Sequence, residues 1–259
     1  MTLLDNLATF FDVLGSTGLV RFVIVAAVLF GLWRGLERAG FTQQERNRTW
    51  LAVTVPLFAW FALIWVLALA DVFRVRPGAF PALPLAIFAP VLLGLVLMTR
   101  SRRIAAALDA LPPSWLVGLQ VYRVFGGAFL VQLALGHLTA FFALPAGIGD
   151  VLVGLLALPV ALYLNRHEDR GRAIAVAWNV FGILDLLVAM AMGFLASTGR
   201  FGIASAPRPI IYPLVMIPAF AVPLSLLLHG VSLWQLKRRA GRSGTSRKLG
   251  SPMVVTKTA

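Results

Sequence analysis

Cysteine is absent from the 259-residue chain, and lysine occurs only three times, against 20 arginines. The lack of cysteine excludes disulfides, thiolate zinc sites and iron–sulfur clusters. No lysine precedes Lys237, which excludes a retinal protein, because that class needs a lysine in its seventh helix. Charged residues make up 13% of the chain, whereas soluble domains average about 25%. Since 59% of the residues are hydrophobic, we expect lipid to cover most of the surface.

Long apolar segments are what the chain has instead. Crossing a bilayer takes about 20 apolar residues. Seven segments are long enough, at 18–34, 51–71, 80–99, 115–136, 140–164, 173–197 and 210–235. Prolines inside the third and seventh segments predict bends there. We therefore predict an all-α integral membrane protein with a seven-transmembrane-helix bundle at 18–236. A six-span arrangement, with one segment merged or omitted, fits the charges less well.

Basic residues are distributed unevenly between the loops that join these segments. If the N-terminus is outside, 17 of the 23 basic residues fall in inner loops and the tail, five fall outside, and Arg123 lies within a span. Lysine and arginine concentrate on the cytoplasmic side of membrane proteins. The sequence thus predicts an N-terminus outside and a cytoplasmic C-terminus. The net charge of +13 is then a topology signal facing anionic lipid, and no nucleic-acid partner is expected.

The two ends of the chain differ from the spans in composition. Residues 1–17 place apolar side chains at helical spacing between polar ones, which predicts an interfacial amphipathic helix, with a frayed terminus as the alternative. Residues 237–259 predict a disordered basic cytoplasmic tail that meets anionic lipid or, less simply, docks a partner. The excess of arginine, alanine and leucine indicates a bacterial chain and so a multi-pass protein of the inner (plasma) membrane. The oligomeric state is left open.

Three charged residues lie deep inside the predicted spans. At a rise of about 1.5 Å per residue, Arg123, Asp150 and Asp185 all fall near the middle of the bilayer. A charge at that depth costs at least ~3 kcal/mol, so such side chains face the bundle interior and pair. Gln120 shares a helix face with Arg123, and Asn179 lies in the same span as Asp185. These five residues are the predicted substrate- or ion-binding site.

Small residues accompany the charges. One face of the fifth span carries Gly147, Asp150 and Gly154, and one face of the sixth carries Gly182, Asp185, Ala189 and Gly193. Such stripes let membrane helices approach closely, so we expect Arg123 between the two carboxylates. One cation facing two anions leaves a negative charge for a proton, a small cation or a substrate ammonium. This favours a small-solute or ion transporter or proton-coupled carrier. An inert salt bridge in a structural membrane subunit is the alternative.

The three histidines do not predict a metal site or a cofactor. His137 falls at the outer end of the fourth span, His167 in a loop, and His229 near the inner end of the seventh span. They are therefore too far apart to hold one ion. Ser225, His229 and Ser232 share a helix face, which predicts hydrogen bonding between helices, with a proton relay as the alternative.

The run Gly147-Ile148-Gly149-Asp150 resembles the GxGD motif of intramembrane aspartyl proteases and prepilin peptidases, and Pro81-Ala82-Leu83-Pro84 resembles their PAL motif. The resemblance implies a second aspartate that shares a proton with Asp150. Here that partner would be Asp185, which follows the motif where the family has it before, and the PAL-like run precedes the motif. An intramembrane protease is thus an alternative function.

A wider resemblance covers 120–236. The residues that carry it are Gln120 to Arg123, Pro145 to Asp150, Trp178, Asn179, Gly182, Asp185 and Pro218 to His229. This pattern is similar to a group of small polytopic bacterial membrane proteins, and it implies membrane location without a named activity. The proline-containing third and seventh spans also resemble each other, as corresponding helices of a parallel three-plus-one-plus-three repeat of spans 1–3 and 5–7 would; this is the topology of small seven-helix sugar transporters. The remaining spans match poorly.

Overall fold

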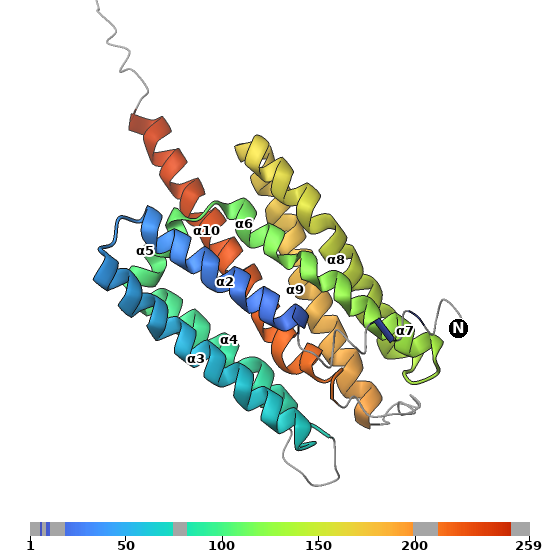
Figure 1. Cartoon of the computed structure of the whole chain (residues 1–259). Helices are drawn as coiled ribbons and strands as arrows, with labels where there is room; N and C mark the ends of the chain where they lie inside the picture. The colour runs from blue at the N-terminus through green and yellow to red at the C-terminus, as the bar shows by residue number, and fades with distance from the viewer. Residues whose placement is uncertain (1–5, 7–8, 11–18, 75–81, 199–211, 250–259) are drawn as a thin grey trace, which may run out of the picture.

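The structure is a computed structural model, and it describes residues 6, 9–10, 19–74, 82–198 and 212–249. Every regular element in these ranges is a helix. In chain order they are α2 (Leu19–Arg38), α3 (Gln43–Leu69), α4 (Ala82–Arg100), α5 (Arg102–Ala110), α6 (Pro113–Gly118), the 3₁₀ helix η1 (Leu119–Gly127), α7 (Ala128–Ala134), α8 (Ala140–Arg166), α9 (Glu168–Thr198), the π-helical turn η2 (Ile217–Ala221) and α10 (Val222–Leu249) (Figure 1).

Seven of the helical segments in the described residues are long and apolar enough to cross a membrane. They are α2, α3, α4, the run α6–η1–α7, α8, α9 and the run η2–α10. The predicted fold class, an all-α bundle of seven such helices, is confirmed. Large apolar side chains such as Val66 and Leu92 lie more than 60% exposed on the outer surface, as expected where lipid covers a helix. Which end faces the cytoplasm stays a prediction from the charges.

The helix ends follow local chemistry more closely than hydropathy. Helix α3 begins at residue 43, ahead of the apolar segment predicted from residue 51, because Thr42 and Glu45 form a capping box that satisfies the first backbone amides. Helix α4 continues through Pro90 without interruption. In the seventh span, Pro218 lies within the π-helical turn η2, and the long helix follows it.

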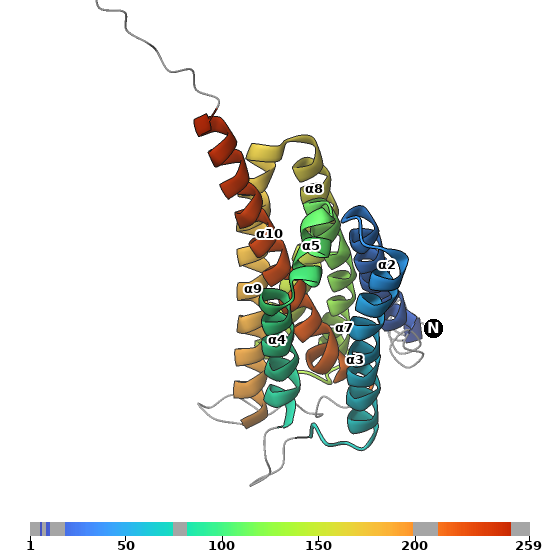
Figure 2. The same cartoon turned by 90° about the vertical axis from the view of Figure 1, so that its left-hand side faces the viewer.

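Helix α10 runs through the interior of the bundle. It contacts α9, α4, α6 and α5, and it crosses the bundle obliquely in the side view (Figure 2). Helices α8 and α9 pack along each other on one side, while α2 and α3 lie on the other. The largest apolar core joins these parts, with Phe61 of α3 against Phe220 of η2 at 4.9 Å between ring centroids.

Two irregular turns meet in the middle of this arrangement. The 3₁₀ segment η1 interrupts the fourth span, and η2 opens the seventh. Runs of 3₁₀ helix longer than a few residues are uncommon, and π-helical turns gather at functional sites. Tyr122 of η1 lies with its hydroxyl 2.5 Å from Ser225 Oγ, and it donates to Ala221 O at 3.4 Å. Tyr122 thus connects the 3₁₀ segment to the π-helical turn and to the start of α10.

Helix α10 continues to Leu249, whereas we expected disorder from residue 237. Contacts with the short helix α5 explain the continuation through its first part. Arg238 forms an ion pair with Asp109 at 2.9 Å, and Arg239 donates to Leu111 O at 2.8 Å. Lysine and arginine are also good helix formers. Residues 250–259, and most of the predicted interfacial helix at 1–17, lie outside the described residues.

Candidate functional site: a buried arginine–carboxylate centre

Arg123 stands on η1 and joins three other helices. Its Nε donates to Asp150 Oδ1 of α8 at 2.7 Å, and Nη2 forms a short ion pair with Asp185 Oδ2 of α9. Its Nη1 donates to Gly182 O and contacts His229 Nε2 of α10, both at 3.2 Å. The side chains of Arg123, Asp150 and Asp185 are only 2, 11 and 7% exposed. The expected meeting of one guanidinium with two carboxylates is present.

Glycines make the close approach possible. A Cβ at Gly126 would lie 2.3 Å from Asp150 Oδ2, and one at Gly149 would lie 1.5 Å from Asp185 Oδ1. A Cβ at Gly182 would lie 2.5 Å from the ring of His229. Each acidic or imidazole group of the centre is thus seated against a glycine of a neighbouring helix, so the small-residue pattern places these side chains as well as the backbones.

His229 connects the centre to a buried polar chain. Because a guanidinium can only donate, His229 Nε2 must accept from Arg123, and the imidazole is neutral with its proton on Nδ1. That Nδ1 lies 2.9 Å from Asn179 Oδ1, and Asn179 Nδ2 donates to Ser232 Oγ at 3.0 Å. The ring of Trp178 packs 5.1 Å from the imidazole. The partners on both sides therefore fix the tautomer of His229.

The charges of the centre do not cancel. Arg123 carries one positive charge, Asp150 and Asp185 carry two negative charges when ionised, and His229 is neutral by its hydrogen bonding. The surplus is a single negative charge in a region where lipid and apolar side chains surround the helices. Such a surplus is costly unless a proton or a cation joins the site. The centre can therefore bind one positive charge.

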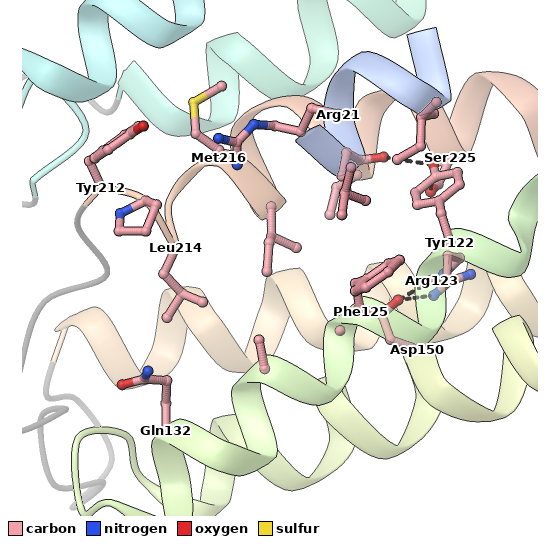
Figure 3. Close-up of a pocket in the computed structure, with 18 of the residues that line it drawn as sticks. Arg21, Tyr122, Arg123, Phe125, Gln132, Asp150, Tyr212, Leu214, Met216 and Ser225 are labelled. Atoms are coloured by element: carbon pink, nitrogen blue, oxygen red, sulfur yellow. Dashed lines mark hydrogen bonds and ion pairs between the residues drawn. The ribbon is translucent and has the colours of Figure 1, made fainter. Parts of the chain in front are cut away.

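A cavity of about 310 Å³ reaches this centre from one end of the bundle. Its inner end is formed by Tyr122, Arg123 and Asp150, and its other end by residues next to the loops, including Gln132 and Tyr212 (Figure 3). Asp185 does not line it. The basic loops predict that this end faces outside. Asp150 is thus the carboxylate that an entering molecule meets.

Towards the opposite end, the polar path continues as packed side chains along α10. Ser225 lines the first cavity; His229, Ser232 and Gln235 follow it on one face of the helix, each at most 1% exposed. Gln235 Nε2 donates to the carbonyls of Leu108 and Leu111 at 2.7 and 2.6 Å. A second cavity of about 280 Å³, lined by Arg172 and Arg239 among others, begins beyond this layer.

The five predicted site residues lie in different parts of this network. Arg123, Asp150 and Asp185 form the centre, and Asn179 joins it through His229. Gln120 is fully buried and does not line the cavity; its amide nitrogen donates to Ser225 O at 3.1 Å.

The position predicted for His229, near the inner end of its span, is wrong. The helical part of that span is Ile217–Gly241, so His229 is in its middle and contacts Arg123. The predicted span is 210–235, so both its start and its end lie too early in the sequence. Arg21 is one of the five basic residues that the charge distribution predicts to lie outside, but it is buried in the cavity wall on α2. Its position three residues into α2 was the available signal.

Other polar residues occupy peripheral positions. Asp71, at the end of the second span, pairs with Arg74 at 2.7 Å, as expected for a bilayer edge. His137 lies with Nδ1 2.8 Å from Gln132 Oε1 at the cavity end nearest the loops. His167 stacks on Tyr163 with ring centroids 4.5 Å apart.

The chain matches a known protein-family model. Residues 79–237 match the family model described as Domain of unknown function (DUF8737). That range contains every residue of the centre and of the polar face of α10. No curated protein and no solved structure matches the chain.

Proposed function

The chain belongs to the DUF8737 family, a domain of unknown function, and we propose from its site that it is a proton-coupled carrier of a small solute with a cationic group in a bacterial inner membrane. The observation that carries the proposal is the cavity that ends on Asp150, within a centre that lacks one positive charge. An inert ion pair would need neither the surplus charge nor an access route.

The surplus negative charge predicts that the protein exchanges a proton for the solute. Because the centre has room for one positive charge, a proton and a cationic solute compete for Asp150 and Asp185. A solute that enters from the cavity displaces the proton, which leaves through the same cavity. The solute is released on the other side when the packed layer along α10 opens, and a proton from that side takes its place. Sites near the bilayer middle, between helices with interrupted hydrogen bonding, are typical of secondary transporters.

The same contacts weigh against the aspartyl-protease alternative. A protease dyad needs two carboxylates that share one proton. Here Arg123 bonds both Asp150 and Asp185, so each carboxylate contacts the guanidinium instead of sharing one proton with the other. In addition, Asp185 lies outside the cavity.

The test uses purified protein in liposomes that contain the pH dye pyranine. External tetramethylammonium or choline is added, because these permanently charged ions do not cross lipid unaided. We expect the internal pH to rise as protons leave in exchange for the cation. Asp150→Asn and Asp185→Asn remove the surplus charge, so each variant should lose this pH change.

Asp71→Asn is the matched control, since it removes a carboxylate that pairs with Arg74 at the bilayer edge. It should behave like the wild type. If the two centre variants still exchange protons at the wild-type rate, the proposed carrier function is wrong. If they change only the stability of the protein, and the wild type moves no cation, the centre is structural.

A further inference from the structure

The cavity carries opposite charges on opposite walls. Asp150 stands beside Arg123 at the inner end, where the surplus negative charge lies. Arg21 of α2 is buried in the other wall, and its side chain extends towards Tyr212 and away from Asp150 (Figure 3). A simple cation gains only at Asp150 and is repelled at Arg21. A ligand with a negative group at its second end gains at both.

Most of the other residues that line the cavity are apolar. They include Ile24 of α2, Phe125 of η1, Leu186 of α9 and Met216. Apolar walls favour hydrocarbon between the two charged ends of a ligand. A volume of about 310 Å³ lies at the lower end of the usual range for ligand pockets, which suits a short chain and not a lipid.

We propose that the solute is an ω-amino acid-like molecule, with an ammonium at Asp150, a carboxylate at Arg21 and a short methylene chain between them. This inference rests on the proposed function and names the solute of the same site. The separation of the charges is its specific content. An α-amino acid carries its ammonium and its carboxylate on the same carbon and cannot place them on opposite walls.

Four six-carbon probes separate the possibilities. They are 6-aminohexanoate, its isomer 2-aminohexanoate, hexylamine and hexanoate, and their binding is measured by calorimetry with the full chain in detergent. We expect 6-aminohexanoate to bind about tenfold or more tightly than each of the other three, because a charge-assisted hydrogen bond carries roughly that factor. Equal binding of 2-aminohexanoate or hexylamine would overturn the inference.

Variants assign each end of the ligand. Arg21→Gln should weaken 6-aminohexanoate about tenfold and leave hexylamine unchanged or tighter. Asp150→Asn should weaken both amines and leave hexanoate unchanged. Arg34→Gln is the control on the same helix, where Arg34 pairs with Glu37 at the surface, and it should change none of the four affinities.

The outcomes separate this inference from the carrier function. If hexylamine binds as tightly as 6-aminohexanoate and needs Asp150, the two-ended ligand is wrong while a cation carrier stands. If 6-aminohexanoate binds through both residues but drives no proton movement in liposomes, the ligand class stands and the carrier function is wrong. If hexanoate binds best, without dependence on Asp150, both are wrong.

Discussion

Arg123 decides the chemistry of the molecule because its five donors are divided among three helices. One guanidinium satisfies Asp150, Asp185, a backbone carbonyl and His229 at once. A lysine ammonium has three donors without a fixed planar arrangement and could not reproduce this set. The sequence could predict the pairing, because so few charges occur in the spans that they had to meet. It could not predict the role of His229, which depends on where the seventh helix begins.

Removal of the guanidinium tests the residue scale. Arg123→Gln leaves two carboxylates buried without their cation, and we expect a loss of about 3–5 kcal/mol in the free energy of unfolding. The triple variant Arg123→Gln, Asp150→Asn, Asp185→Asn carries no charge in the centre and should recover most of that loss. Unfolding in detergent, followed by tryptophan fluorescence, measures both. A triple variant as unstable as the single one would show that shape, and not charge, sets the cost.

Glycine substitution tests the seating of Asp185. In Gly149→Ala the new methyl group occupies the position of the carboxylate, so Asp185 must leave Arg123 or the helices must separate. We expect the free energy of unfolding to fall by about 1–3 kcal/mol, which is typical of overpacking. The proton exchange of the centre should also be lost. Gly118→Ala is the matched control, because its methyl group meets only Ala161 at an ordinary 3.7 Å. A neutral result for Gly149→Ala would contradict this packing.

At the scale of the elements, the sequence predicts the spans but not the irregular helices or the helix ends. Hydropathy located all seven spans because each is a long, mostly apolar segment. It did not reveal the 3₁₀ segment at Leu119–Gly127, since hydropathy reports how apolar a segment is and not its number of residues per turn. The ends of α3 and α10 also differed, because capping and ion pairs with α5 extend helices past their apolar part.

The contact between Gln235 of α10 and the end of α5 gives a prediction at the scale of the elements. Gln235→Leu removes one of two donors to Leu108 O, which also accepts from Leu111 N, and one of two donors to Leu111 O, which also accepts from Arg239. A hydrogen bond of this kind contributes about 0.5–1.5 kcal/mol to stability. We expect lower stability and faster hydrogen exchange in α5, measured by mass spectrometry. Gln44→Leu on the exposed start of α3 should change neither. Unchanged exchange would show that Gln235 does not hold α5.

For the whole molecule, the number of spans was predictable and the cavity was not. The span count needs only the length of apolar segments, whereas the cavity depends on how side chains from α2, η1, α8 and η2 pack together. Arg21 shows the difference. As a basic residue near a span end it looked like an outer anchor, yet the tilt and packing of α2 turn it into the cavity wall.

The predicted orientation has a direct test, because the chain has no cysteine and a single introduced one is a unique label. Gln44→Cys lies at an end predicted to be cytoplasmic, and Ala140→Cys at the end predicted to be outside; both positions are exposed. A maleimide that cannot cross membranes should label Ala140→Cys in intact cells, and Gln44→Cys only in inverted vesicles. The reverse pattern would show that the N-terminus is inside.

The contacts of Arg123 with α8, α9 and α10 limit how these helices can move. Any sliding of α10 against the α8–α9 pair stretches either the bond to His229 or the bonds to the carboxylates, so the helices cannot shift while all of these contacts are intact. A positive charge that arrives at Asp150 weakens the interaction between Arg123 and Asp150. Occupancy by a proton or solute and freedom of the helices to move are then a single event at one side chain.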